Sequence, residues 1–194
     1  MLENIILTTK ALGNFSDDEF YNFCLENPDL KFERTSKGQI IIMPNTGGNT
    51  GRINSAIIFQ LYGWNLKMEL GEVFDSSTAF RLPNTAVRSP DASWITKNRW
   101  ESLTEKQQKQ FPPLCPDFVI ELRSETDSWA DLDKKIQEEW LVNGCRLAWL
   151  IDPLEQKAYI YRPEQTVEEV SSFDHILKGE HVLPAFELNL ESLK

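Results

Sequence analysis

The sequence has 194 residues, of which 41% are hydrophobic and 11% aromatic, a composition that supports a packed core and excludes a disordered chain. The formal net charge of -10 argues against binding nucleic acid through a broad basic surface, although excess carboxylates permit binding of hard divalent cations. No apolar run is long enough to span a membrane and no secretory signal pattern opens the chain, so we expect a cytoplasmic protein without membrane contacts.

The cysteines and histidines do not form a recognisable site. The three cysteines are widely separated and contain no CxxC pair, which excludes a disulfide framework and a thiolate zinc site. The two histidines, His175 and His181, have the wrong spacing for a metal pair on one helix face, and no catalytic triad can be assembled around them.

The N-terminal third predicts a helix, a hairpin and a longer helix. A capping box from Ser16 to Glu19 opens a short helix that ends at Asn27 and Pro28. Two strand-like segments, 31–34 and 39–43, flank a Lys-Gly turn and indicate a hairpin. The following "PNTGGNTG" lacks the Lys-Ser/Thr pair of a phosphate-binding loop, so we interpret it as the entry to a helix over about 52–69.

From residue 71 onward the pattern is mostly that of strands. "EVFDSS", "AFRLP" and "AVRSPDASWI" predict short strands, and the polar segment 96–110 predicts a solvated helix. The strand "PDFVIELR" is followed by an amphipathic helix in "DSWADLDKKIQEEWLVNG", with Gly144 as its C-terminal cap. "RLAWLID" predicts a strand covered on both faces, "KAYIYRP" predicts its hairpin partner, and a β-rich tail closes the chain.

This element order predicts one α/β or α+β domain with a mixed β-sheet flanked by helices. We expect the single domain to span residues 1–194. Within it, 1–48 form the N-terminal helix and hairpin, 49–163 the core, and 164–194 a β-rich C-terminal extension.

The strand "PDFVIELR" carries charge where a core strand is expected. Because side chains alternate along a strand, Val119, Glu121 and Arg123 share a face with Asp117, whereas Phe118, Ile120 and Leu122 form an apolar face. Ligands of a sheet generally bind beyond the ends of its strands, which is where Glu121 and Arg123 lie.

A second acid, Asp91, lies in "RSPDASWI", a segment that also predicts a strand. If the two strands are neighbours, Asp91 and Glu121 converge and provide the carboxylates that Mg²⁺ prefers, with the carbonyl of Leu122 as a further oxygen ligand. Such an ion would polarise a phosphoryl oxygen and lower the pKa of a bound water. We therefore predict a metal site formed by Asp91, Glu121 and Leu122.

Pro90-Asp91 followed by Glu121-Leu122-Arg123 resembles the motif of the PD-(D/E)xK nuclease superfamily, with arginine where lysine is usual. More specifically, "SPDASWI", "PDFVIELRSETD" and "NGCRLAWLIDP" followed by "AYIYRP" resemble the Uma-type restriction endonucleases, as do "MPNTGG" and "FDSSTAFRLPN". The resemblance covers roughly residues 15–190. It implies a restriction-endonuclease-like core, Mg²⁺ or Mn²⁺ as the cofactor, DNA as the substrate and a homodimer as the working form.

The chain departs from this pattern at two places, the lysine position of the motif and the segment before the long helix. Arg123 cannot act as a general base because a guanidinium stays protonated, although it can hold a phosphate. Relatives often take the active-site lysine from the following helix, where this chain has Lys134 and Lys135, and we assign the catalytic role to Lys135. Relatives often place a Glu or His before the long helix, where this chain has Asn49 and Thr50; Asp75 is a candidate substitute.

Each assignment has a structural alternative. Glu121 could form an ion pair with Arg123 or Arg146, and Lys135 could be a solvated helix residue. Trp129 and Trp140 fall on the apolar stripe of their helix and are expected in the core. Two functions follow: a Mg²⁺-dependent endonuclease in which Asp91, Glu121, Arg123 and Lys135 act together, or a catalytically inactive, dimeric binding or scaffold module with the same fold.

Overall fold

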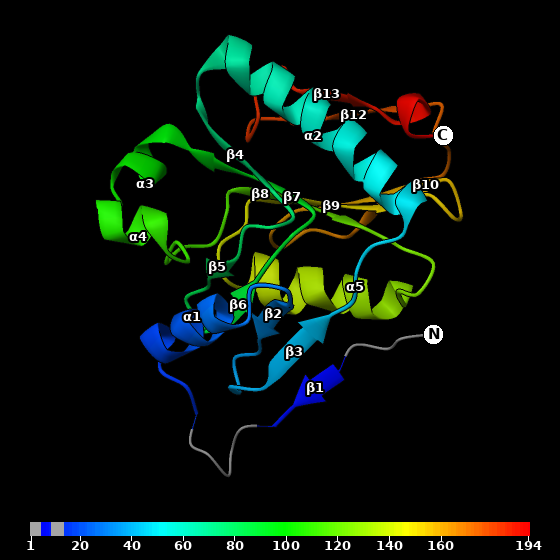
Figure 1. Ribbon diagram of the computed structural model, residues 1–194. Helices are drawn as coiled ribbons and strands as arrows, with labels where there is room; N and C mark the ends of the chain where they lie inside the picture. Colours follow the sequence, from blue (N-terminus) through cyan, green and yellow to red (C-terminus); the bar gives the residue numbers. More distant parts are fainter. Residues whose placement is uncertain (1–4, 9–13) are drawn as a thin grey trace.

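A computed structural model describes residues 5–8 and 14–194, which form three β-sheets and the helices that pack on them (Figure 1). The central sheet has six strands in the order β11-β10-β9-β8-β7-β4. Its strands, in chain order, are β4 (Gly71–Asp75), β7 (Ala92–Thr96), β8 (Phe118–Leu122), β9 (Leu147–Asp152), β10 (Lys157–Tyr161) and β11 (Glu168–Val170).

A second, five-stranded sheet has the order β1-β3-β2-β6-β5, and a two-stranded sheet pairs β12 with β13. The strands of the five-stranded sheet are β1 (Ile5–Leu7), β2 (Lys31–Arg34), β3 (Ile40–Met43), β5 (Phe80–Arg81) and β6 (Val87–Arg88). The two strands near the C-terminus are β12 (Ile176–Lys178) and β13 (Glu187–Asn189).

The structure has the predicted helices, which differ in extent, and a short 3₁₀-helix in the C-terminal segment that was predicted as β-rich. They are α1 (Asp17–Glu26), α2 (Gly48–Met68), α3 (Lys97–Glu101), α4 (Glu105–Lys109), α5 (Trp129–Lys135), the π-helix η2 (Ile136–Leu141) and the 3₁₀-helix η3 (Leu190–Leu193). The single helix predicted over 96–110 is two short helices, because Thr104 starts a new capping box with Gln107. The helix after β8 changes to π-helical pairing halfway along. None of the helices in the described ranges is long and apolar enough to cross a bilayer.

The central sheet confirms the predicted strand pairing. β7 and β8 are antiparallel neighbours with Ala92 opposite Ile120, and β8 runs parallel to β9 with Glu121 opposite Leu150. β9 and β10 form the predicted hairpin. The mixed sheet flanked by helices is therefore the predicted fold class.

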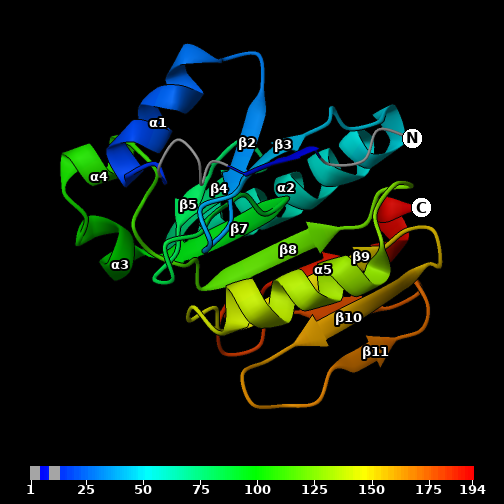
Figure 2. The same cartoon turned by 90° about the horizontal axis from the view of Figure 1, so that it is seen from below.

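The two faces of β8 enter two different parts of the core, as the alternation predicts. Phe118, Ile120 and Leu122 belong to a cluster that α2 and the C-terminal segment cover, whereas Val119 belongs to a cluster that includes Trp140 of η2. Figure 1 shows α2 on one side of the central sheet and α5 on the other, and Figure 2 shows α5 in front of β9, between β8 and β10.

The hairpin of β2 and β3 lies on the α5 side of the sheet rather than apart from it (Figure 1). Its sheet is continued by β6, which leads through Ser89 and Pro90 into β7 of the central sheet. The capping box predicted at Ser16 and Glu19 is confirmed, and Asp17 of the same helix forms ion pairs with Arg34 and Arg81. The N-terminal segment is thus joined to the central sheet directly beside Asp91.

Candidate metal and nuclease site

Asp91 is fixed to the end of strand β8 by two hydrogen bonds. Its backbone N–H donates to the carbonyl of Ile120 at 3.0 Å, and its Oδ2 accepts the N–H of Leu122 at 2.7 Å. The side chain of Asp91 thus extends the ladder between β7 and β8 by one more bond. Burial raises the pKa of this carboxyl above its ordinary value, and the Leu122 N–H and the Lys135 ammonium offset only part of that rise.

Glu121 is almost completely buried, with 3% of the residue exposed. Its Oε1 accepts the indole N–H of Trp140 at 2.6 Å and lies 2.9 Å from the ammonium of Lys135, which also donates to Oε2 at 3.2 Å. Burial is the largest cause that raises the pKa of Glu121 to about 7, Asp91 adds to it by repulsion, and Lys135 opposes it. Asp91 therefore lies close enough to Glu121 to disfavour ionisation of the Glu121 carboxyl.

A π-helical turn brings Lys135 and Trp140 together at Glu121. The two residues are five positions apart, and in an α-helix such side chains point about 140° away from each other. The i→i+5 hydrogen bonding of η2, which starts directly after Lys135, widens the turn and places both on the side that faces β8. Lys134 instead pairs with Glu138 at 3.8 Å on the exposed face, so Lys135 is the lysine of this helix that meets Glu121.

Arg123 lies just beyond the end of β8 and points toward β9. Its Nη1 forms an ion pair of 2.6 Å with Asp152, whose side chain is 1% exposed, and its Nε donates to the carbonyl of Asp127 at 3.2 Å. The backbone N–H of Arg123 donates to the carbonyl of Ile151 at 2.9 Å, so the pairing with β9 continues past Leu122, and the guanidinium is engaged by Asp152 and not by Glu121. The cation in contact with Glu121 is Lys135.

The alternative partners predicted for Glu121 pair with other acids. Arg123 contacts Asp152, as described, and Arg146 lies 3.7 Å from Asp117 at the opposite end of β8. Glu121 therefore forms neither of the two alternative ion pairs, with Arg123 or with Arg146. Trp140 is in the core, as expected, but its indole N–H also holds Glu121, a contact that the hydrophobic pattern alone does not reveal.

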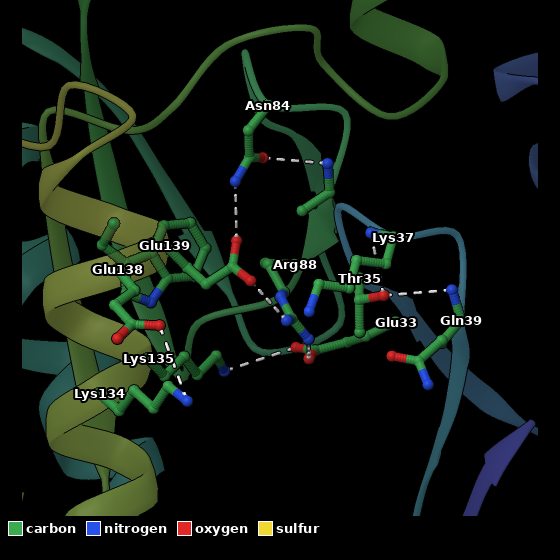
Figure 3. A network of polar contacts seen from close by, with 12 residues as sticks. Glu33, Thr35, Lys37, Gln39, Asn84, Arg88, Lys134, Lys135, Glu138 and Glu139 are labelled. Atoms are coloured by element: carbon green, nitrogen blue, oxygen red, sulfur yellow. Dashed lines mark hydrogen bonds and ion pairs between the residues drawn. The ribbon is translucent and has the colours of Figure 1, made fainter.

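Glu33, a residue that the sequence analysis did not select, lies in strand β2 and is also 3% exposed. Its Oε1 accepts the backbone N–H of Ser89 at 2.9 Å and lies 3.5 Å from the ammonium of Lys135, and its Oε2 pairs with Arg88 at 2.9 Å (Figure 3). Burial alone would raise the pKa of Glu33, but Lys135 and Arg88 lower it below its ordinary value. Glu121 was identified as an acid inside the apolar strand FVIEL, whereas Glu33 lies in the polar strand KFER, where an acid gives no such signal.

The remaining candidate ligands contribute less. Asp75 ends β4 opposite Ala92 and is exposed, and its Oδ1 accepts the N–H and the hydroxyl of Ser77, so it caps a turn. Within residues 5–8 and 14–194, no group of three or more His, Cys, Asp or Glu side chains is arranged to hold a metal. The side chain of Leu122 belongs to the core, and its backbone N–H is the donor that holds Asp91.

The site combines two carboxyl groups, those of Asp91 and Glu121, whose pKa values are raised. The ammonium of Lys135 contacts Glu121. Oxygen donors of this kind suit hard divalent cations such as Mg²⁺ and Mn²⁺, and a bound cation favours the ionised form of both acids. The ammonium of Lys135 can stabilise negative charge that develops beside them.

Comparisons with known proteins identify the family of the chain. The model of the Uma2 family, described as "Putative restriction endonuclease", matches residues 17–191. None of the curated proteins matches the chain.

Among solved structures, the crystal structure of a putative nuclease belonging to DUF820 from Anabaena variabilis ATCC 29413 is 24% identical, with a TM-score of 0.75. The alignment covers 92% of this chain and 97% of that one, and at this identity it shows a shared fold. Both findings confirm the resemblance seen in the sequence. Because the family model spans nearly all of the sequence, the chain belongs to the Uma2 family of putative restriction endonucleases.

Proposed function

We propose that this protein is a metal-dependent endonuclease that hydrolyses the phosphodiester bonds of DNA. Membership of a family described as restriction endonucleases supports a nuclease. The observation that carries the finer proposal is the convergence of Asp91 and Glu121 at the shared end of β7 and β8, with Lys135 in contact with Glu121.

The residues present fit a divalent cation by their chemistry. Asp91, Glu121 and the carbonyl of Leu122 would hold Mg²⁺ or Mn²⁺ through oxygen atoms, and waters would complete its coordination. The raised pKa values of both acids are what two buried carboxylates show when no cation neutralises them. When bound, the ion supplies a Lewis acid for the phosphoryl oxygen and lowers the pKa of a coordinated water.

The protein's own groups have separate tasks in this proposal. Burial would lower the pKa of Lys135, but Glu121 and Glu33 raise it above its ordinary value, so Lys135 remains an ammonium. Lys135 therefore acts as a hydrogen-bond donor and a positive charge that stabilises the phosphorane-like transition state, and it does not act as a base. Arg123 cannot act as a base either, and we propose that it orders the end of β8 where the phosphate binds.

Duplex cleavage needs one such site for each strand, so we propose that the working form is a homodimer in the cytoplasm. Light scattering at assay concentration tests the assembly independently of the chemistry. A monomer that cuts both strands would contradict the dimer and leave the assignment of Asp91 and Glu121 standing.

Cleavage of supercoiled plasmid and of single-stranded DNA, with Mg²⁺ or Mn²⁺ and with EDTA, tests the proposed function. We expect cleavage by the wild type that EDTA abolishes, and no detectable cleavage by Asp91→Ala or Glu121→Ala. Glu138→Gln is the matched control, because it alters an exposed acid on η2 that pairs only with Lys134 among the ion pairs of the described residues.

Two results would contradict the nuclease. One is a wild-type protein that cuts neither substrate with either metal, and the other is cleavage that survives in both alanine variants. The first result would favour the alternative function, a nuclease-fold scaffold or binding module without turnover.

A further inference from the structure

The N-terminal hairpin contributes a buried acid to the surroundings of Lys135. Glu33 lies in β2, far from β8 and α5 in the sequence, yet its carboxylate faces the helix that carries Lys135 (Figure 3). The figure shows the hairpin on one side, the helix on the other and Arg88 between them. The site therefore includes a residue from outside the segment 49–163 that the sequence assigns to the core.

The ammonium of Lys135 meets three acceptors from three separate elements. Glu121 of β8 lies 2.9 Å away, the carbonyl of Ser89 before β7 at 3.4 Å, and Glu33 of β2 at 3.5 Å. A lysine ammonium has three N–H donors on a stem with four rotatable bonds, so it is well fixed only when several acceptors surround it. This set of acceptors provides one for each N–H.

Glu33 is itself held rigidly. Its Oε1 accepts the N–H of Ser89 at 2.9 Å, and its Oε2 pairs with Arg88, which in turn pairs with Glu139 at 2.8 Å. Arg88 thus already has a second acid on η2. Glu33 contacts both cations, Arg88 at 2.9 Å and Lys135 at 3.5 Å, and it is the second acid in contact with Lys135.

The difference between the two acids of Lys135 becomes important when Glu121 binds a cation. A carboxylate that serves as a metal ligand has less negative charge to offer a neighbouring ammonium. Glu33 and Ser89, which help to fix Lys135 without a cation, then provide a larger share of the contacts that keep it in place. We propose that Glu33 is a positioning residue that holds the ammonium of Lys135 beside Asp91 and Glu121, so that the N-terminal hairpin completes the active site; this rests on the proposed function.

The test compares Glu33→Gln with Glu139→Gln, a matched variant that removes an acid from the same network without touching Lys135. The first readout is the mobility of the Lys135 side chain, measured by NMR relaxation of ¹³Cε-labelled lysine in the full-length, metal-free protein. We expect the Lys135 order parameter in Glu33→Gln to fall toward that of the exposed Lys134, and to keep its wild-type value in Glu139→Gln.

The second readout is plasmid cleavage with Mn²⁺. We expect Glu33→Gln to lower kcat by about tenfold while KM stays within about twofold, because a misplaced catalytic group weakens the transition state and not the binding of DNA. Glu33→Asp keeps the charge with a shorter reach, and both readouts should lie between those of the wild type and Glu33→Gln.

An order parameter of Lys135 that is the same in Glu33→Gln and in Glu139→Gln would overturn the positioning role, whether or not the protein cuts DNA. If Glu33→Gln does not fold, Glu33→Asp decides by the same readout. If the wild type has no nuclease activity, only the proposed function is contradicted, because the mobility of Lys135 is measured without metal or substrate.

Discussion

The same dipeptide, Pro-Asp, precedes two neighbouring strands, and the two aspartates make the same backbone contacts at opposite ends of the β7–β8 pair. The N–H of Asp91 donates to Ile120 and its Oδ2 accepts from Leu122, two residues further on. In the same way, the N–H of Asp117 donates to Trp94 and its Oδ2 accepts from Thr96 at 2.9 Å. The dipeptide is thus a local device that closes a strand pair at its end.

The two aspartates differ in the charged side chains that surround their carboxylates. At Asp117 the Oδ1 lies 2.9 Å from the guanidinium of Arg99, so its charge is compensated within the protein. Asp91 has the second carboxylate of Glu121 as its neighbour, and burial together with this repulsion raises the pKa of Glu121. The charge of Asp117 is balanced by arginine, whereas Asp91 and Glu121 form the cation site that we propose.

The largest expected effect separates the two aspartates by activity. Asp91→Asn keeps an acceptor for the Leu122 N–H but removes the charge, and we expect kcat/KM on plasmid DNA to fall by at least about 100-fold. Asp117→Asn, assayed where it is folded, should stay within about threefold of the wild type. Equal losses in the two variants would mean that both aspartates act only through the fold.

The next comparison concerns the two adjacent lysines of the helix. Lys135→Met removes the ammonium beside Glu121 and should lower kcat by about 100-fold, as the loss of one donor to a transition state does. Lys134→Met removes an exposed ion pair with Glu138 and should leave kcat unchanged. Single-turnover cleavage measures both, and a Lys135→Met variant as fast as Lys134→Met would exclude the lysine from the chemistry.

Stability should rank the two aspartates in the opposite order. Asp117→Asn leaves Arg99 without its acid, and because Arg99 is partly exposed we expect a loss of about 2 kcal/mol in the free energy of unfolding. Asp91→Asn removes repulsion from Glu121 and should lose less than about 1 kcal/mol. Urea denaturation in EDTA gives both values, and a greater loss for Asp91→Asn would reverse the roles of the two sites.

Arg123→Lys has the smallest expected effect. Lysine can keep the pair with Asp152 but loses the hydrogen bond from Nε to the Asp127 carbonyl, so we expect a loss of about 1 kcal/mol and activity within about threefold. A loss of activity as large as that of Lys135→Met, at unchanged stability, would restore Arg123 to the catalytic role that its place in the sequence motif suggests.

Local patterns of the sequence predicted the parts of the molecule that depend on local physics. The capping box at Ser16, the hairpins and the alternation of β8 are set within a few residues, and all are present in the structure. The prediction that Asp91 lies near Glu121 needed only that β7 and β8 be adjacent strands. Once they pair with Ala92 opposite Ile120, the register sets the positions of both acids.

The other contacts of the candidate site depend on features that local sequence patterns do not encode. Arg123 pairs with Asp152 of the neighbouring strand β9 and not with Glu121, and the alternation along β8 does not show which acid the arginine meets. The π-helical turn decides which lysine meets Glu121, since a shift of one residue turns a helical side chain by about 100°. Glu33 reaches the site only because a separate sheet packs beside the helix.

The melting temperature with and without Mg²⁺ or Mn²⁺ tests the central claim, a cation site at Asp91 and Glu121, most directly because it needs no substrate. A ligand at about 100 times its Kd adds about 2.7 kcal/mol, which for a chain of this size raises Tm by about 5 °C or more. We predict such a rise for the wild type and for Asp117→Asn, and none for Asp91→Asn. An equal rise in all three proteins, or no rise in the wild type, would contradict the account.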